Sequence, residues 1–332
     1  MTVRSNGVSV LVASFNAEAT IQTAIRSALR DPGTLEVLVI DDASTDATAK
    51  LVEEEARSDA RVRLFRQSAN AGPGAARNRG IDEARGSHIA VLDSDDFFLP
   101  DRLHLLGDTH KCELIADNII FTNPEQVDTV CSRDWTSTAP DFTPCELSSF
   151  VTGNLKDQGP ARGELGFLKP VMSLTFLNTH GLRYDETMRL GEDYDLYVRM
   201  MLAGGRMKTT LRPGYGAVVR SGSLSAQHST HDLGLFAEAL ARHLDAPDIP
   251  KPALKPMRQH LHEVRARWAH RRFLDLRREI GNAAAIRYAA HPSRFSAISG
   301  GIARDKLGFT AHAGAALPEC GYRLLLDPST ED

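Results

Sequence analysis

The sequence predicts an α/β fold in which a mainly parallel central sheet is flanked by helices. Two observations support this prediction. Four short apolar runs, rich in β-branched residues, alternate with helical segments in the first hundred residues, and strands separated in this way are joined by crossovers into a parallel sheet. In addition, polar or acidic residues follow these runs directly. Because ligands of parallel sheets bind at the carboxyl ends of the strands, we expect a ligand site there.

Apolar periodicity and the residues that end each run define the expected elements. The expected strands are VSVLVA (8–13), LEVLVI (35–40), VRLFRQ (62–67) and SHIAVLD (87–93). The expected helices cover residues 18–30, 46–57 and 74–85. The polar residues that follow the strands, which we expect to converge, are Asn16, Asp41, Asp42, Asn70, Asp93 and Asp95.

The pattern is weaker after this half. Several prolines interrupt residues 104–170, where LIADNIIF is the one clear strand. We expect residues 171–182 and 193–203 to be helical and residues 206–220 to form a strand. Residues 251–280 hold nine Lys or Arg against three Asp or Glu, a net charge of +6, beside an apolar stripe from Met257 to Trp268. This segment is expected to be a cationic helix.

Composition excludes several classes of protein. The 332 residues are 42% hydrophobic and 25% charged, with a net charge of −4, so nothing indicates a nucleic-acid partner. The four cysteines form no CxxC pair, which argues against a zinc site or a disulfide framework and fits a reducing cytoplasm. We find neither a cleavable signal nor an apolar window long enough to span a membrane. We therefore expect a cytoplasmic protein.

The stretch AVLDSDDFFLP (90–100) places three carboxylates within four positions, directly behind an apolar run. Like charges held so close repel, and a divalent cation would offset that repulsion. Asp93 and Asp95 are two residues apart and so share a face of an extended backbone. Both can address Mg²⁺ or Mn²⁺, which prefer oxygen ligands and leave positions open for phosphate oxygens. The alternative is a solvated acidic turn.

Three further stretches carry candidate chemistry. Asp41 and Asp42 can accept hydrogen bonds from a ribose or a base, or can simply form the turn that starts the next helix. The glycine-rich stretch 70–80 combines glycines for close backbone approach with Arg77 and Arg79 for phosphate or base-edge contact, or is simply a turn with solvent-facing arginines; it is neither GxGxxG nor a P-loop. Glu192 and Asp193 begin a helix, where a carboxylate is either a general base or a favourable charge on the helix dipole.

Taken together, these stretches resemble the inverting nucleotide-sugar glycosyltransferases of family 2, which have the Rossmann-like GT-A fold. The four matching stretches occur in the family's order and span residues 8–203; they are VSVLVASFNAEATIQTAIRSAL, VLVIDDASTDAT, NAGPGAARNRGIDEARGSHIAVLDSDDFFLPDRL and GEDYDLYVRML. The resemblance implies a GT-A domain over residues 1–225, with a nucleotide-binding half of about 1–103 and an acceptor half of about 104–225. A mostly helical region over residues 226–332 would follow.

The resemblance also implies roles for individual residues. Asp93 and Asp95 would bind the metal and the diphosphate of the donor, and Asp193 would be the catalytic base. The residues implied to contact the donor are Ala13, Asn16, Asp42, Asn70, Arg77, Ser94 and Arg220. The match around Arg220 is loose, because Ala217 and Val218 stand where the family has an aromatic–basic pair.

The implied reaction is metal-dependent and inverting. It would move a sugar from a nucleotide-diphosphate sugar, typically a UDP-sugar, to a hydroxyl of a glycan or lipid-linked acceptor in bacterial exopolysaccharide or surface-glycan assembly. The cofactor would be Mg²⁺ or Mn²⁺. The cationic helix 251–280 could contact anionic lipid at the inner face of the plasma membrane, or could simply pack its apolar stripe on the main domain.

Two other functions compete with this one. A haloacid-dehalogenase-like phosphohydrolase also places a DxD motif at a strand end, but its nucleophile lies on the first strand, whereas Asp93 follows the fourth. A catalytically silent sugar-nucleotide-binding scaffold would not need the acids that the chain retains.

Overall fold

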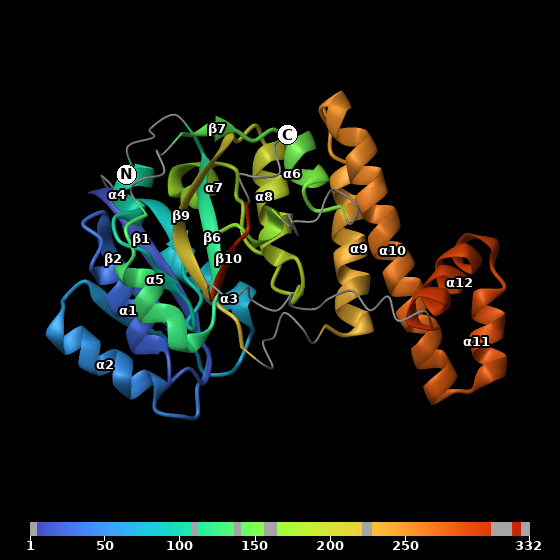
Figure 1. Ribbon diagram of the computed structural model, residues 1–332, viewed down its shortest axis with the longest axis horizontal. Coiled ribbons are helices and arrows are strands. Elements are labelled where there is room, and N and C mark those ends of the chain that lie inside the picture. Colours follow the sequence, from blue (N-terminus) through green and yellow to red (C-terminus); the bar gives the residue numbers. More distant parts are fainter. Residues whose placement is uncertain are drawn as a thin grey trace.

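The computed structural model describes residues 5–107, 112–135, 141–155, 165–220, 228–306 and 321–326. One mixed sheet, flanked by helices, forms the body of the molecule, and a group of long helices stands beside it (Figure 1). The strand order along the sheet is β3 (Val62–Arg66), β2 (Thr34–Asp41), β1 (Ser5–Ser14), β4 (Gly86–Val91), β8 (Val171–Ser173), β6 (Leu114–Thr122), β9 (Met207–Val218) and β5 (Phe97–Phe98). The helices α11 (Asn282–Ala289) and α12 (Pro292–Lys306) lie farthest from the sheet.

The amino-terminal half has the expected parallel arrangement. Its strands are β1 (Ser5–Ser14), β2 (Thr34–Asp41), β3 (Val62–Arg66) and β4 (Gly86–Val91), and each paired strand is parallel to its neighbour. Its helices are α1 (Ile21–Leu29), α2 (Thr48–Ser58) and α3 (Pro73–Glu83). Ser14 pairs with Asp41, and Asp41 pairs with Arg66, so the carboxyl ends of the strands lie level. This register brings the polar residues after each strand to one end of the sheet.

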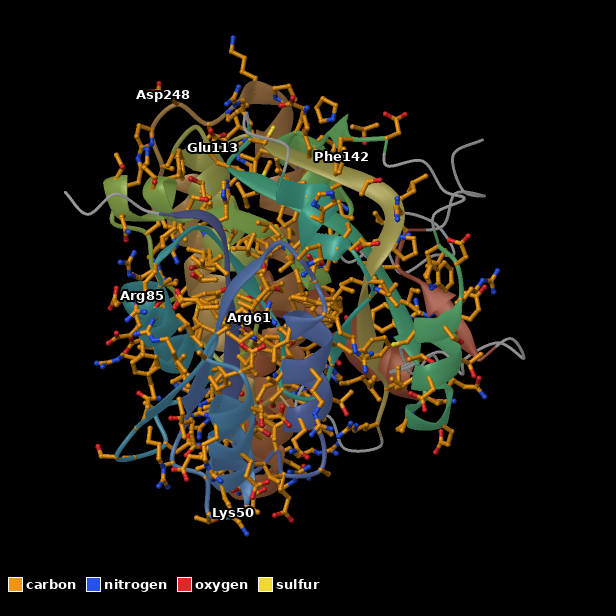
Figure 2. The ribbon with its side chains drawn as sticks, turned by 90° about the vertical axis from the view of Figure 1, so that its left-hand side faces the viewer. Lys50, Arg61, Arg85, Glu113, Phe142 and Asp248 are labelled. Atoms are coloured by element: carbon orange, nitrogen blue, oxygen red, sulfur yellow. The ribbon has the colours of Figure 1, made fainter. Side chains whose placement is uncertain are left out.

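Near the opposite end of these strands, Glu36 is a buried acid with a structural role. Glu36 is buried near the start of β2 and accepts hydrogen bonds from the Ser9 hydroxyl, the Arg85 backbone amide and the Arg63 guanidinium. Arg61 closes the same region by pairing with Asp59 (Arg61 and Arg85 are labelled in Figure 2). Glu36 is thus saturated by protein donors.

The second half of the sheet contains both strand directions. β6 (Leu114–Thr122) runs parallel to β9 (Met207–Val218), while β8 (Val171–Ser173) lies antiparallel between β4 and β6. The short strands β5 (Phe97–Phe98) and β7 (Thr143–Pro144) pair with β9. The helices are α4 (Arg102–Gly107), α5 (Val127–Ser132), α6 (Leu147–Thr152), α7 (Leu174–Thr179) and α8 (Glu192–Leu202), with 3₁₀ turns at Pro124–Gln126 and Leu165–Phe167.

One expectation in this half is wrong. Residues 171–182 do not form a single helix, because the first three of them are strand β8 and only Leu174–Thr179 is helical. A short apolar run fits either a buried strand or a buried helix, and pairing with β4 and β6 decides for the strand. The expected acceptor half also includes residues 108–111, 136–140, 156–164 and 221–227, which lie outside the described residues.

The carboxyl-terminal helices are α9 (Thr230–Leu244), α10 (Lys251–Glu279), α11 and α12. Of these, α9 and α10 contribute buried side chains to the main hydrophobic core. Met257, Leu261 and Val264 of α10 are buried in the same cluster as the sheet, and Trp268 packs against it. The apolar stripe therefore faces the main body. After this helical group, β10 (Tyr322–Leu324) returns to pair with β6. Within the described residues, no helix has the length and apolar character needed to cross a membrane.

Candidate active site

Charged side chains from four parts of the chain meet beyond the carboxyl end of β4. Asp93 and Asp95 follow directly after β4, and Arg77 of α3 contacts Asp93. Asp193 lies in the first turn of α8, and Lys169 precedes β8 by two residues. The sheet order explains this convergence, because β4 pairs with β8 on one side and with β1 on the other.

Two cations and two carboxylates form a closed ring of ion pairs, which we call the charge ring. Arg77 contacts Asp93 Oδ1 at 2.8 Å through Nη2 and Asp193 Oδ1 at 3.2 Å through Nη1. Lys169 Nζ contacts Asp93 Oδ2 at 2.9 Å and Asp193 Oδ2 at 2.8 Å. Glu192 Oε1 also accepts from Arg77 Nη1, at 2.9 Å. Asp93 and Asp193 are thus each held by both cations.

The electrostatics of the ring follow from its burial and its pairing. Burial alone would raise the pKa of Asp93, but Lys169 and Arg77 lower it well below the ordinary value. Burial opposes the charge of Lys169, yet Asp193 and Asp93 raise the pKa of its ammonium above the ordinary value. Both cations are almost fully buried, at 5% exposure for Arg77 and 8% for Lys169. Asp93, Lys169 and Arg77 therefore stay ionised, although both cations are largely removed from water.

Asp95 lies beside the charge ring but is not a member of it. Burial and the adjacent Asp93 raise its pKa, an effect that Arg220 only partly offsets. In the described part of the chain its carboxylate has no hydrogen bond or ion pair with another side chain. A carboxylate in this position carries a charge that a bound cation would stabilise.

The third acid of the cluster holds the local fold. Asp96 accepts hydrogen bonds from the Tyr215 hydroxyl and the Val218 amide, both at 2.8 Å, and so ties the turn after β4 to β9. The Tyr215 hydroxyl also accepts from the Asp93 amide at 3.1 Å. Burial, together with Asp93 and Asp95, raises the pKa of Asp96 well above its ordinary value. The three clustered carboxylates therefore differ in role: one is paired, one is unpaired and one is structural.

Asp42 and Asn16 form hydrogen bonds to the loops at the carboxyl end of the parallel strands. Asp42 is buried and accepts hydrogen bonds from the backbone amides of Ala71 and Gly72, both at 2.8 Å, and from Gln67. It thereby shapes the glycine-rich turn before α3. Asn16 has a left-handed φ of 49°, and its side-chain oxygen accepts from the Thr45 amide at 2.9 Å. Both residues border the predicted donor site, and direct contact with a nucleotide stays a prediction.

The other predicted donor residues lie around the same opening. Ala13 is half-buried near the end of β1, Asn70 is exposed before α3, and Ser94 is in the turn after β4. Arg220 follows β9, and its Nε atom is buried without a hydrogen-bond partner in the described residues. Its effect on the pKa of Asp95 places it near the acidic cluster. An unpartnered guanidinium atom there suits the predicted contact with a diphosphate.

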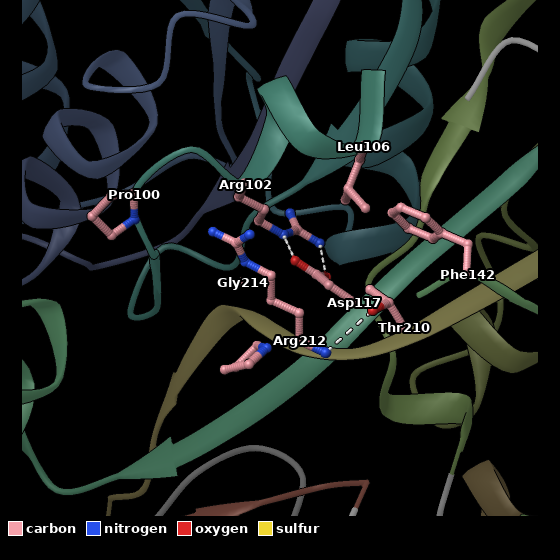
Figure 3. Close-up of a pocket in the computed structure, with 9 residues that line it drawn as sticks. Pro100, Arg102, Leu106, Asp117, Phe142, Thr210, Arg212 and Gly214 are labelled. Atoms are coloured by element: carbon pink, nitrogen blue, oxygen red, sulfur yellow. Dashed lines mark hydrogen bonds and ion pairs between the residues drawn. The ribbon is translucent and has the colours of Figure 1, made fainter. Parts of the chain in front are cut away.

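Sequence reasoning missed Lys169. It is a single lysine between Leu168 and Pro170, with no motif or spacing that singles it out. Its backbone is fixed by Arg102, which donates to the Lys169 carbonyl at 2.5 Å. Arg102 is in turn held by two parallel hydrogen bonds to Asp117, at 2.7 and 2.8 Å (Figure 3). This fork-to-fork pair is buried.

The carboxyl-terminal helices hold α8 and hence Asp193. Gly191 caps α8 with a φ of 73°, and a Cβ there would lie 2.6 Å from the Phe236 ring of α9. The Tyr194 hydroxyl lies 3.0 Å from His260 Nδ1 on α10. Asp195 Oδ1 lies 2.9 Å from His243 Nε2 on α9. Asp193 thus faces the charge ring, whereas the next two residues, Tyr194 and Asp195, contact α10 and α9.

The residues present fit a divalent ion that also takes ligands from its substrate. No group of three or more His, Cys, Asp or Glu residues suited to hold a metal occurs in the part of the chain that the structure describes. Mg²⁺ and Mn²⁺ bound with nucleotides need only one or two protein carboxylates beside phosphate oxygens and water. The unpaired Asp95 next to Asp93 meets that requirement, although both oxygens of Asp93 are already paired.

The chain belongs to glycosyltransferase family 2 and is therefore a transferase. The family model described as "Glycosyl transferase family 2" matches residues 9–118. The chain is 42% identical over 312 residues to the succinoglycan biosynthesis protein ExoU of Rhizobium meliloti (strain 1021). The aligned region covers 94% of this chain and 91% of that relative. This relationship confirms the family predicted from the four sequence stretches.

Two solved structures share the fold. TarS 1–349 of S. aureus in complex with UDP-GlcNAc superposes with a TM-score of 0.58 at 20% identity, over 82% of this chain and 74% of that chain. The mannosyltransferase PcManGT of Pyrobaculum calidifontis in complex with GDP-Man and Mn²⁺ superposes with a TM-score of 0.57 at 16% identity, over 93% and 82%. These likenesses confirm the GT-A fold.

The Arg102–Asp117 pair requires a glycine at residue 214, because a Cβ there would lie 1.8 Å from Asp117 Oδ2. We predict that Gly214→Ala breaks this pair and lowers the free energy of unfolding by about 3 to 5 kcal/mol, as expected when a buried ion pair is disrupted. Denaturant unfolding measures the change. Gly204→Ala is less suitable as a control because its φ is positive, whereas Gly300→Ala meets open space and should cost little. Equal stability of the Gly214 and Gly300 variants would contradict the prediction.

His260 makes stability depend on pH. Burial, together with Arg267 and His243, lowers its pKa to about 4, so the unfolded chain binds a proton that the folded chain does not. Its contribution is complete above pH 6.5 and is lost as the pH falls from 6.5 towards 4, by about 3 kcal/mol in all. We predict that His260→Phe flattens the pH dependence of unfolding in this window. His262→Phe on the exposed face of α10 is the control and should leave the slope unchanged.

Proposed function

We propose that this chain is a metal-dependent inverting glycosyltransferase that uses a nucleotide-diphosphate sugar, with a UDP-sugar as the first candidate. The observation that carries the proposal is the division of the acids beside β4 and α8. The charge ring neutralises Asp93 and Asp193, while Asp95 keeps an unpaired charge near Arg220. A site of this kind can take a cation and a diphosphate together. The named ligands of TarS and PcManGT, UDP-GlcNAc and GDP-Man with Mn²⁺, support this class of donor.

The acceptor is proposed to be a hydroxyl of a growing glycan or of a lipid-linked glycan in exopolysaccharide or cell-surface glycan biosynthesis. Support comes from the relative ExoU, whose name places it in succinoglycan biosynthesis and whose sequence this chain covers almost completely. The phosphohydrolase and silent-scaffold alternatives gain no support from the comparisons. The matching family model is a glycosyl transferase, ExoU is named a biosynthesis protein and PcManGT is named a mannosyltransferase.

The reaction proposed is a single displacement. Asp193 accepts the proton of the acceptor hydroxyl as that oxygen attacks the anomeric carbon, so the configuration inverts. Arg220 stabilises negative charge that builds up on the departing diphosphate. A bound divalent ion would supply further charge stabilisation to the same diphosphate. Asp193 is suited to its role because its carboxylate is fixed at two oxygens and still has free lone pairs.

Donor binding provides the direct test of the metal-side acid. We predict that UDP with Mn²⁺ raises the apparent stability of the wild-type protein by about 2.7 kcal/mol at a ligand concentration of 100 times Kd. Asp95→Asn should lose most of this gain because the unpaired carboxylate is removed. Thermal unfolding with and without UDP, GDP and Mn²⁺ measures the effect. Asp101→Asn is a matched control, since Asp101 is exposed and asparagine tolerates its φ of 60°. Equal gains in both variants would exclude Asp95 as the ligand.

The catalytic base is tested separately. We predict that Asp193→Asn lowers turnover by about 10²- to 10⁴-fold, the range expected for loss of general-base help. The stabilisation by UDP and Mn²⁺ should remain, because Asp95 and Arg220 are unchanged. Release of nucleotide from the sugar donor that binds best in the thermal panel measures turnover. Asp101→Asn again serves as the control, and near-normal turnover of Asp193→Asn would remove Asp193 from this role.

Contact with an anionic membrane is proposed for the far end of the helical group. α10 is strongly cationic, and Ile280, Ile286 and Phe295 are 67%, 65% and 62% exposed on and after α10, on α11 and on α12. Cationic helices with exposed apolar side chains bind anionic bilayers by combining charge attraction with apolar insertion.

We predict that the protein floats with vesicles containing phosphatidylglycerol but not with vesicles of phosphatidylcholine alone, and that high salt releases it. The double variant Ile286→Ser and Phe295→Ser should float less. Phe15→Ser removes another exposed aromatic side chain, outside the helical group, and serves as the control. Binding that ignores both salt and lipid charge would count against the proposal.

A further inference from the structure

Lys169 contacts the acid predicted on the donor side and the acid predicted as base at the same time. Its ammonium lies 2.9 Å from Asp93 Oδ2 and 2.8 Å from Asp193 Oδ2. The side chain is buried, so these two carboxylates take the place of solvent around its charge. One ammonium thus joins two parts of the site.

The surrounding fold places this lysine. β8 pairs antiparallel with β4 in the register Ala90 to Val171, and continuing that register sets Lys169 opposite Leu92, directly beside Asp93. Arg102, itself held by Asp117, fixes the carbonyl of Lys169. The backbone position of Lys169 is thus set by strand pairing and by a buried ion pair.

The other contacts of Asp193 are weaker. Arg77 Nη1 reaches Asp193 Oδ1 at 3.2 Å, the longest contact in the charge ring, and it is shared with Glu192 Oε1 at 2.9 Å. Without Lys169, this shared contact would be the one ion pair left to the Asp193 carboxylate among the described residues. An error of about 1 Å in the position of a reacting group can cost on the order of 10²-fold in rate.

We propose that Lys169 is a positioning residue for the glycosyl transfer, which holds the carboxylate of Asp193 at a fixed place relative to Asp93. The proposal rests on the proposed function, because it takes Asp193 as the base. Lys169 itself transfers no proton and forms no bond to the sugar. It sets the separation between the group that receives the proton and the acid beside the predicted metal site.

Substitution by an isosteric apolar residue tests this role. For Lys169→Met we expect kcat to fall by about 10- to 100-fold, with the donor KM changed by less than about three-fold. The gain in thermal stability with UDP and Mn²⁺ should persist, since Asp95 is untouched. Lys208→Met makes the same chemical change on β9, outside the charge ring, and should leave kcat as in the wild type. If Lys169→Met does not fold, Lys169→Gln carries the same test.

A double-mutant cycle separates positioning from a general loss of structure. If Lys169 acts through Asp193, then Lys169→Met in the Asp193→Asn background lowers kcat by no more than about two-fold further. A purely structural role would lower kcat by the same factor in both backgrounds. Wild-type kcat in Lys169→Met, or a multiplicative loss in the double variant, overturns the proposal while leaving Asp193 as the base. Normal turnover of Asp193→Asn alone would instead overturn the proposed function.

Discussion

The ring of ion pairs among Arg77, Asp93, Lys169 and Asp193 is the interaction on which the site depends. An unpaired charge buried in a protein costs several kcal/mol, and breaking a buried pair leaves such a charge behind. Here each carboxylate is shared between two cations, so acids from β4 and α8 can lie close together without mutual repulsion dominating. The ring also explains the crowding of acids after β4, because it neutralises Asp93 and leaves Asp95 as the exception.

Much of the surrounding structure serves to hold the members of this ring. The antiparallel strand β8 sets Lys169 beside the end of β4, and the Arg102–Asp117 pair fixes its backbone. Asp96 and Tyr215 anchor the turn that carries Asp93 to β9. The mixed direction of the sheet therefore shapes the charge ring, since a strand antiparallel to β4 begins at the end of the sheet where the parallel strands finish and places Lys169 there.

The helical group after residue 228 contributes to the same end. α9 and α10 contact consecutive residues of α8 through His243 and His260, and Phe236 packs against the glycine that caps α8. Because α8 is anchored to α9 and α10, Asp193 in its first turn has a fixed position in the site. The sharing of one hydrophobic core between α10 and the sheet gives this support its rigidity.

The sequence by itself determined the parallel half of the sheet, the polar residues at its carboxyl ends and the family. These features are local: a strand shows in a few apolar residues, and each family stretch is contiguous. The identity of α8 and of Glu192 and Asp193 at its start could be read in the same way.

Tertiary structure alone decided which acids are paired, which one is left without a partner, and that Lys169 belongs to the site. Arg77 and Asp193 are 116 residues apart in the chain, and their contact depends on where α8 is placed by helices that follow it. Likewise, Val171–Ser173 form strand β8 because they pair with both β4 and β6. A periodicity within three residues cannot show such pairing. Local patterns fix elements, whereas charge pairing is set by distances that exist only once the chain has folded.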